Sequence, residues 1–252
     1  MKYIFLLLFS LAPTLFYAQS GSNKKDNTPS NAWLIFAGFS FDQKAEDLSN
    51  RFGYSNSASL SVEHFWGKNK VFGGITGHYG FGTEVKEDVL MNLRTPQGDI
   101  IGSNNSLASV FLRERYWYTG LYAGKLFGFI GKNKQSGLRL ALGAGIWQHW
   151  IRIQDDTNNA AQVAGDYEKG YDRMTNGPAA YGSIGYQHFS NNGLVNFHVS
   201  FEVTKGWLTH QRAWNFTDNI PGGEKRNDMM YGVRVAWALP FFYGGKEEVI
   251  FY

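Results

Sequence analysis

The chain has 252 residues, of which 43% are hydrophobic, 17% aromatic and only 18% charged, and its mean hydropathy is −0.32. The absence of cysteine excludes disulfide frameworks, thiolate metal sites and cysteine nucleophiles. The formal net charge is only +3 and no basic block occurs, which argues against nucleic acid as a partner.

The first segment has the pattern of an export signal. Lys2 precedes a short apolar run, which ends at Ala18 and Gln19. The run is too short and too interrupted for a helix that spans the membrane, and an N-terminal anchor helix is the alternative. No later apolar run is long enough to form a transmembrane helix. We therefore expect a signal peptide over residues 1–18 and a flexible, polar periplasmic leader over 19–30.

The rest of the chain alternates between apolar and small or polar residues with a period of two. In the last such segment, Tyr231, Val233 and Val235 share one face, and Gly232 and Arg234 share the other. This alternation over about ten residues is typical of a transmembrane β-strand. The fourth segment is too long for one crossing, so its Arg-Glu-Arg cluster is expected above the bilayer or beside a bulge. The eight segments are 32–41, 55–66, 71–81, 107–129, 137–151, 178–189, 195–203 and 231–241.

The lengths of the connections give an independent indication. Three are short and contain the Asn and Gly that we expect to supply the positive φ of a tight turn, and four are long and polar. Short and long alternate strictly, as in bacterial outer-membrane barrels with short periplasmic turns and long outer loops. The short ones are 67–70, 131–136 and 190–193, and the long ones are 42–54, 82–106, 152–177 and 208–227.

The apolar faces distinguish a membrane barrel from a soluble one. A secreted β-sandwich or lipocalin-like barrel also alternates, but its outward face is polar. Here one face is apolar along whole strands, and only helices and closed barrels satisfy their backbone groups in lipid. The sequence therefore predicts an all-β, eight-stranded antiparallel transmembrane up-and-down β-barrel in the cell outer membrane, over 31–242, with a periplasmic tail over 243–252.

The two ends of the predicted strands are rich in aromatic residues, which is typical of the aromatic girdles at the two membrane interfaces. The girdle residues that we predict are Trp33, Trp66, Trp117, Trp147, Trp150, Trp207 and Phe241.

The inward faces carry a smaller set of polar and charged residues. An eight-stranded barrel is only wide enough inside for side chains, so buried charges there must pair with one another. We expect a satisfied polar plug rather than a diffusion pore, with a functional relay or a small ion path as the alternative. The predicted lumen residues are Glu63, His78, Arg139, His149, His198, Glu202 and Arg234.

Taken over the whole mature chain, this pattern resembles the small eight-stranded outer-membrane barrels of the OmpA/OmpX-like kind. The Tyr17-Ala18-Gln19 processing region and the Tyr-, Asn- and Gly-rich strands also look like those of Bacteroidota. Phe241 and Phe242 resemble the C-terminal aromatic signal of barrels that the outer-membrane assembly machinery inserts. The resemblance implies that machinery, outer-membrane lipid and lipopolysaccharide as partners.

One short stretch resembles a catalytic motif. His188-Phe189-Ser190-Asn191, with Glu202 a dozen residues after the serine, is similar to the PagL-like lipid A 3-O-deacylases. The resemblance implies His188 as the base, Ser190 as the nucleophile and Glu202 as the orienting acid. If Asn191 and Asn192 form the turn, each residue of one strand pairs with the residue of the other strand that brings the sum of the two residue numbers to 383. Glu202 then lies about 23 Å from His188 and on the other face of the sheet. We therefore expect no catalytic site, with the deacylase as the alternative.

No other constellation indicates an enzyme, and we expect neither a cofactor nor a metal site. The acidic residues of one long connection can bind divalent cations near lipopolysaccharide or simply form a solvated loop. Two non-enzymatic functions remain: a structural or adhesive barrel that acts through its outer loops, and an accessory subunit of an envelope complex that docks through residues 243–252. The acidic residues are Asp155, Asp156, Asp166, Glu168 and Asp172.

Overall fold

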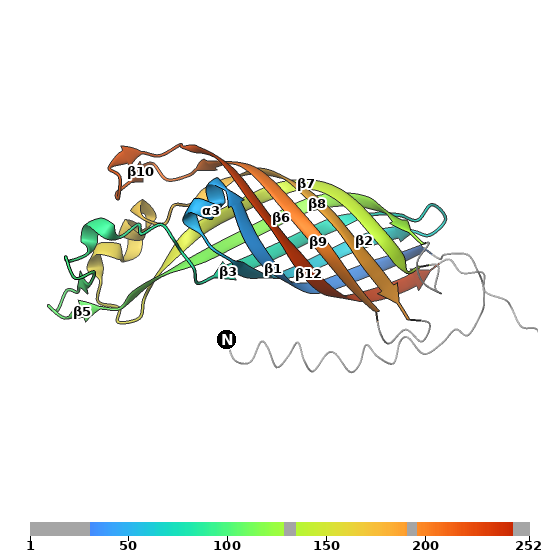
Figure 1. Ribbon diagram of the computed structural model, residues 1–252, viewed down its shortest axis with the longest axis horizontal. Coiled ribbons are helices and arrows are strands. Elements are labelled where there is room, and N and C mark those ends of the chain that lie inside the picture. The colour runs from blue at the N-terminus through green and yellow to red at the C-terminus, as the bar shows by residue number, and fades with distance from the viewer. Residues whose placement is uncertain (1–30, 129–134, 191–195, 244–252) are drawn as a thin grey trace, which may run out of the picture.

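The computed structural model describes residues 31–128, 135–190 and 196–243, in which eight long antiparallel strands close into a barrel (Figure 1). Each strand pairs with its neighbour along the chain, and the first pairs with the last. The predicted all-β, eight-stranded up-and-down fold is therefore confirmed. The strands are β1 (Asn31–Glu46), β2 (Ser55–Trp66), β3 (Val71–Gly82), β6 (Val110–Phe127), β7 (Gly137–Asp155), β8 (Thr175–Phe189), β9 (Asn196–His210) and β12 (Lys225–Tyr243).

The period of two sorts the side chains to the two sides of the barrel wall, because successive residues of a strand point to opposite faces. In β12, Val235 and Trp237 are about half exposed outside, whereas Arg234 and Ala236 are buried inside. Leu142 of β7 is 77% exposed on the same outer surface. The outside of the wall is thus apolar and accessible, which is the arrangement that a surrounding lipid phase stabilises.

Several strands extend further than the apolar alternation predicted. β1 continues to Glu46, β7 to Asp155 and β9 to His210. These extensions are polar, so hydropathy ends before the backbone pairing does. The bulge considered for residues 113–115 is absent, because β6 pairs with β7 in an unbroken register through this segment and with β3 as far as Glu114.

The four long connections gather at one end of the barrel, which we call the loop end (Figure 1). They cover residues 47–54, 83–109, 156–174 and 211–224, and in the described part of the chain no helix is long and apolar enough to cross a membrane. Their short elements are α3 (Asp47–Arg51), η2 (Met91–Leu93), β4 (Ile100–Ile101), β5 (Leu107–Ala108), η3 (Ala161–Val163), η4 (Gly165–Gly170), β10 (Trp214–Asn215) and β11 (Ile220–Pro221).

The short connections lie at the opposite end, the turn end. Residues 67–70 join β2 to β3, and the positive φ of 54° there belongs to Lys70. The prediction that Asn or Gly supplies it is therefore wrong at this turn. Most of the other two predicted turns, 131–136 and 190–193, lies outside the described residues.

The barrel interior is filled by large side chains packed against glycines. A Cβ atom on Gly80 of β3 would lie 1.8 Å from the ring of Tyr116, so only glycine leaves room for this buried ring. Tyr116, Tyr118 and Trp147 are among the largest fully buried side chains. The high glycine content thus serves packing inside a narrow barrel.

The lipid-facing surface gives the first testable prediction. Leu121 of β6 is 68% exposed on the outside near the middle of the strand. Leu121→Arg should lower the free energy of unfolding by about 2–4 kcal/mol in phosphatidylcholine vesicles, because arginine is costly at the bilayer midplane. Urea titration monitored by tryptophan fluorescence measures it.

The matched control for this prediction is Gln43→Arg, which places the same side chain on the outside near the loop end of β1. This substitution should lower the free energy of unfolding by only about 0–1 kcal/mol, because arginine costs little near the membrane interface. Equal effects of the two substitutions would contradict a lipid-facing wall.

Candidate functional site

The interior at the turn end holds a buried carboxylate and a guanidinium from opposite sides of the barrel. Glu63 of β2 accepts hydrogen bonds from Arg139 of β7 at 2.6 Å and from the Tyr122 hydroxyl at 2.7 Å. The Arg139 guanidinium lies 3.7 Å from the ring centroid of Phe72 and donates to Gln187. Glu63 is 0% exposed and Arg139 5%, so their charges are compensated mainly by each other.

A second pair lies further toward the loop end. Arg234 of β12 and Glu202 of the adjacent β9 approach to 2.6 Å. Glu202 also accepts hydrogen bonds from the Tyr181 hydroxyl at 2.7 Å and from Ser200 at 3.0 Å. The carboxylate is thereby fixed by three donors on three side chains.

The third layer joins β1 to β6. Lys44 lies 2.8 Å from Glu114 and donates to Ser55 at 2.7 Å, and all three side chains are buried. Asp42 lies two residues before Lys44 on the same inward face of β1, and it accepts a hydrogen bond of 2.5 Å from Tyr116. The barrel interior thus alternates charge pairs with aromatic rings along its whole length.

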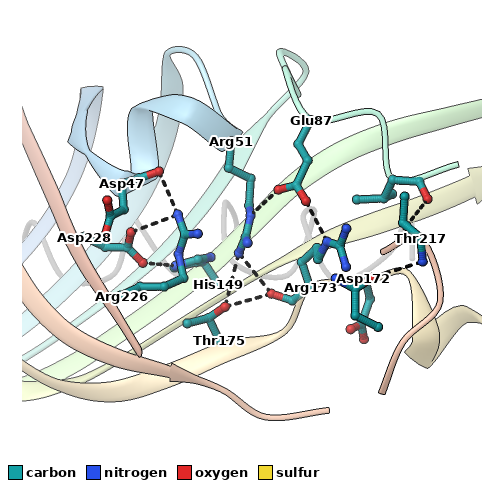
Figure 2. A network of polar contacts seen from close by, with 12 residues as sticks. Asp47, Arg51, Glu87, His149, Asp172, Arg173, Thr175, Thr217, Arg226 and Asp228 are labelled. Atoms are coloured by element: carbon teal, nitrogen blue, oxygen red, sulfur yellow. Dashed lines mark hydrogen bonds and ion pairs between the residues drawn. The ribbon is translucent and has the colours of Figure 1, made fainter. Parts of the chain in front are cut away.

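At the loop end a continuous series of ion pairs connects all four long connections, and Figure 2 shows its part from Arg51 through Glu87 to Arg173. Arg51 of α3 donates to Glu87 at 2.7 Å, and Arg173 donates to the other oxygen of Glu87 at 2.7 Å. Arg173 also donates to Asp218 at 3.0 Å. Each of the four residues belongs to a different connection. We call this series the loop network.

The loop network is anchored on the barrel by a second set of contacts, also drawn in Figure 2. His149 of β7 lies 2.8 Å from Asp228 of β12, which also accepts from Arg226 at 3.3 Å. Arg226 donates to the main-chain oxygen of Asp47 in α3 at 2.7 Å. Arg51 reaches Thr175 of β8 at 3.2 Å. The first loop is therefore tied to β12 and β8, and the contact of His149 with Asp228 links β12 to β7 across the lumen.

Apolar side chains of the loops pack into the same end of the barrel. Leu48 and Phe52 of the first connection and Leu90 of the second are fully buried in one cluster with Trp147 and Ile151 of β7. Burial of side chains of this size contributes about 1.5–3 kcal/mol each. The loops are thus folded onto the barrel as part of its core.

Glu87 is the centre of the loop network, and its titration governs the stability of the network. Burial raises the pKa of Glu87, but the positive charges and hydrogen bonds of Arg51 and Arg173 lower it more, so the net shift is downward. A carboxyl whose pKa is lowered in the folded state contributes stability above its ordinary pKa and loses it as the pH falls through the folded value.

All seven predicted lumen residues are buried and lie on the inward face of their strands. Glu63 pairs with Arg139, and Glu202 pairs with Arg234. His149 contacts Asp228 at the loop end. His78 lies 3.0 Å from the Thr76 hydroxyl, and the ring of His198 packs edge-on against Phe36.

The prediction did not include several inward-facing charged residues, among them Asp42, Lys44, Glu114 and Asp228. Asp42 and Lys44 were assigned to a loop, Glu114 to a cluster above the bilayer, and Asp228 to no strand. Each continues the inward parity of its strand, as Lys44 continues that of Ser40. Extending the alternation through polar residues would have found them.

Of the predicted girdle, Trp33, Trp66, Trp207 and Phe241 are exposed on the outside, and Trp117 and Trp150 lie on the outward face, half-buried. Trp147 is wrong, because it is 0% exposed and points inward among the rings of the loop-end core. Its odd number on β7 gives it the same inward parity as Arg139.

The register of the two strands that carry the deacylase-like residues, β8 and β9, differs from the one predicted. β8 and β9 pair so that residue numbers sum to 385, with His188 opposite Phe197 and Ser183 opposite Glu202. His188 stacks on Phe197 on the outside, whereas Glu202 is inside with Arg234. Five residues separate Glu202 from the partner of His188, about 16 Å along the strand. The base and the acid of the proposed triad therefore do not meet, and residues 191–195, which follow Ser190, lie outside the described residues.

The acidic connection residues are used within the loops. Asp155 accepts hydrogen bonds from the backbone of Asn159 and Ala160, and Asp172 pairs with Arg212. Within the ranges that the structure describes, no group of three His, Asp or Glu side chains has the geometry of a metal site.

No protein-family model matches the chain, and no curated protein matches it in sequence. Among solved structures, Neisserial surface protein A is similar, at 10% identity over 83% of this chain and 97% of that one, with a TM-score of 0.44. Ail, the attachment invasion locus protein of Yersinia pestis, covers 84% and 99% at 7% identity, with a TM-score of 0.37. The N-terminal β-barrel domain of Pseudomonas aeruginosa OprF covers 84% and 99% at 15% identity, with a TM-score of 0.36.

The wall itself determines the compartment. It is closed, so its backbone groups are satisfied without water, and its outside is apolar along all eight strands. Closed antiparallel barrels of this form span bacterial outer membranes, with short turns at one end and long loops at the other. The protein is an outer-membrane β-barrel. Its Bacteroidota origin and the deacylase resemblance stay predictions.

Protonation of Glu87 should loosen the loops without opening the barrel. As the pH falls below the ordinary pKa of a glutamate, the loop amides should lose hydrogen-exchange protection, because the ion pairs with Arg51 and Arg173 are lost. Glu87→Gln should show low protection of the same amides already at neutral pH and little further change on acidification. Protection factors measured by mass spectrometry test this, and the amides of β7 serve as the internal control. Equal pH profiles of the two proteins would contradict it.

Proposed function

We propose that this barrel is a structural and interaction protein of the outer membrane, with a plugged lumen and an outer surface built from its four loops. The observation that carries the proposal is the loop network, which joins Arg51, Glu87, Arg173 and Asp218 from four different connections. Loops held in one conformation lose less entropy on binding than mobile loops do. A solute channel has no need of such a surface.

The exposed side of the loops supports the same function. It carries large apolar and aromatic side chains that are more than a third exposed, and aromatic residues and methionine are enriched at protein interfaces. Tyr167, Met91 and Leu107 are more than 60% exposed. The others are Ile101, Trp214, Phe216 and Ile220.

The plug is supported by the three layers of paired charges. The pair of Glu63 with Arg139, the pair of Glu202 with Arg234 and the pair of Lys44 with Glu114 follow one another along the lumen. An eight-stranded barrel has room inside for side chains and little else. An ion crossing it would have to separate pairs that are buried away from water, at a cost of several kcal/mol for each.

The remaining hypotheses have less support. Residues 244–252 lie outside the described residues, so docking of an accessory subunit through the tail keeps only its sequence argument. The deacylase alternative lacks contact between His188 and Glu202, which face opposite sides of the wall. We propose no catalytic activity and no cofactor, and the assembly machinery, outer-membrane lipid and lipopolysaccharide remain the proposed partners.

The plug is tested by conductance. Purified barrel reconstituted in a planar phosphatidylcholine bilayer should give no large, stable conductance steps, because paired side chains fill the lumen. A trimeric general porin reconstituted in parallel is the positive control. Large, stable conductance steps from the barrel would contradict the proposal that the lumen is plugged. They would not contradict the proposal that the loops form an interaction surface.

The loop surface is tested by photo-crosslinking in cells. A benzophenone amino acid in place of Tyr167 or Trp214 should give a discrete crosslinked protein product, since both side chains are exposed at the loop end. The same amino acid at Tyr243, at the turn end, tests the accessory-subunit hypothesis.

The control position for crosslinking is Leu142, which faces lipid and should give no discrete protein product. Products from Tyr243 alone would overturn the loop proposal in favour of the subunit. Products from no position would also count against it.

A further inference from the structure

A hollow of about 510 Å³ lies on the outside of the wall near the loop end, across β2, β3, β6 and β7. Three arginines line it, Arg113 and Arg115 of β6 and Arg152 of β7, together with the exposed rings of Tyr54 and Tyr79.

The register explains why the arginines converge. Arg113 pairs directly with Arg152 across the strands, and Arg115 is two residues from Arg113 on the same outward face. Like charges at directly opposite positions destabilise a strand pair. The arrangement therefore has an electrostatic cost that an anion between the guanidiniums would remove.

Among the residues that the structure describes, no carboxylate pairs with these arginines. Within the described ranges none of the three forms an ion pair, although Arg115 donates a hydrogen bond to the main-chain oxygen of Glu114. Elsewhere on the outer wall, Lys205 pairs with Glu46. The carboxylate of Glu114 is turned inward to Lys44. The three guanidiniums thus face outward with their donors available.

The height of the cluster fits the headgroup region of the outer leaflet. On the outside of β6, Lys125 and Arg115 are ten residues apart, with Ala123, Leu121 and Trp117 among those between them. Ten residues span about 33 Å along a strand, or about 25 Å along the membrane normal at the usual tilt. This matches the height of the apolar band of such barrels, so the two charges mark its edges.

The surface below the cluster is suited to acyl chains. Ile75 and Leu60 are about half exposed on the outside of β3 and β2, on the membrane side of Tyr79. A ligand bound at the arginines would continue along these side chains into the lipid phase. The site therefore favours an anionic headgroup attached to acyl chains over a free anion.

We propose that Arg113, Arg115 and Arg152 bind the phosphate of an outer-leaflet lipid, as carried by lipid A of lipopolysaccharide. Guanidinium groups bind phosphate through paired, charge-assisted hydrogen bonds, and three of them match its oxygens and its charge. The ring of Tyr79 and the apolar wall below take the adjoining part of the lipid. The inference rests on the proposed function in so far as lipopolysaccharide is already a proposed partner, and it does not use the loop-surface proposal.

The test compares the chain with its triple variant Arg113→Gln, Arg115→Gln, Arg152→Gln in phosphatidylcholine vesicles that contain diphosphoryl lipid A as a minor component. After extraction in mild detergent, native mass spectrometry counts the lipid A molecules retained per barrel. Retention should fall at least about tenfold in the triple variant, since charged hydrogen bonds are lost. The triple Arg→Lys variant keeps the charge but not the paired geometry and should retain an intermediate amount.

The matched control is Lys86→Gln, Lys169→Gln, Lys225→Gln, which removes the same charge from exposed positions outside the hollow and should retain lipid A normally. Circular dichroism verifies that each variant has folded. Should the arginine variant fold poorly, the single variant Arg152→Gln is used, with a smaller loss expected.

Three outcomes would overturn the inference. Equal retention by the chain and the triple arginine variant excludes the site. Equal retention of phosphatidylglycerol in place of lipid A shows a general anionic surface. Displacement of lipid A by millimolar inorganic phosphate shows a small-anion site. None of these results bears on crosslinking from the loops, so failure here and failure of the proposed function are distinguishable.

Discussion

The structure depends on the pairing of charges inside a closed wall. Once eight strands close in lipid, their inward side chains have little water to interact with, and each buried charge must find its partner across the lumen or on the next strand. Glu63 and Arg139 meet from opposite sides of the barrel, and Glu202 meets Arg234 from an adjacent strand. These pairs hold the strands in one register, because a shift of one residue would turn every charge toward lipid.

The same pairing continues beyond the membrane into the loops. His149 and Asp228 form the inward pair nearest the loops. Arg226 donates hydrogen bonds both to Asp228 and to the main-chain oxygen of Asp47 in α3. From there Arg51 and Glu87 begin the loop network. A narrow lumen and an ordered outer surface are therefore two parts of one arrangement, in which the barrel interior serves as the base of the loops.

The sequence predicted what depends on local alternation and missed what depends on pairing between strands. The apolar faces identified the barrel, and inward parity identified residues such as Arg139 and Arg234. Trp147 was misplaced because its residue type was given more weight than its parity. The register of β8 with β9 was wrong by two residues, since the turn that sets it was assumed from composition. The loop network joins residues far apart in the chain, and no local pattern signals such contacts.

The segment Arg113-Glu114-Arg115 shows how one register serves both sides of the wall. Its glutamate points inward to Lys44 and completes the plug layer nearest the loops, while its two arginines point outward at the edge of the apolar band. A bulge here would have placed two successive residues, the glutamate and one arginine, on the same face. Regular pairing with β7 keeps the glutamate on the inward face and both arginines on the outward face. The regularity of β6 therefore lets three consecutive charged residues satisfy the lumen and the lipid boundary together, with outward charges left for a ligand from the membrane.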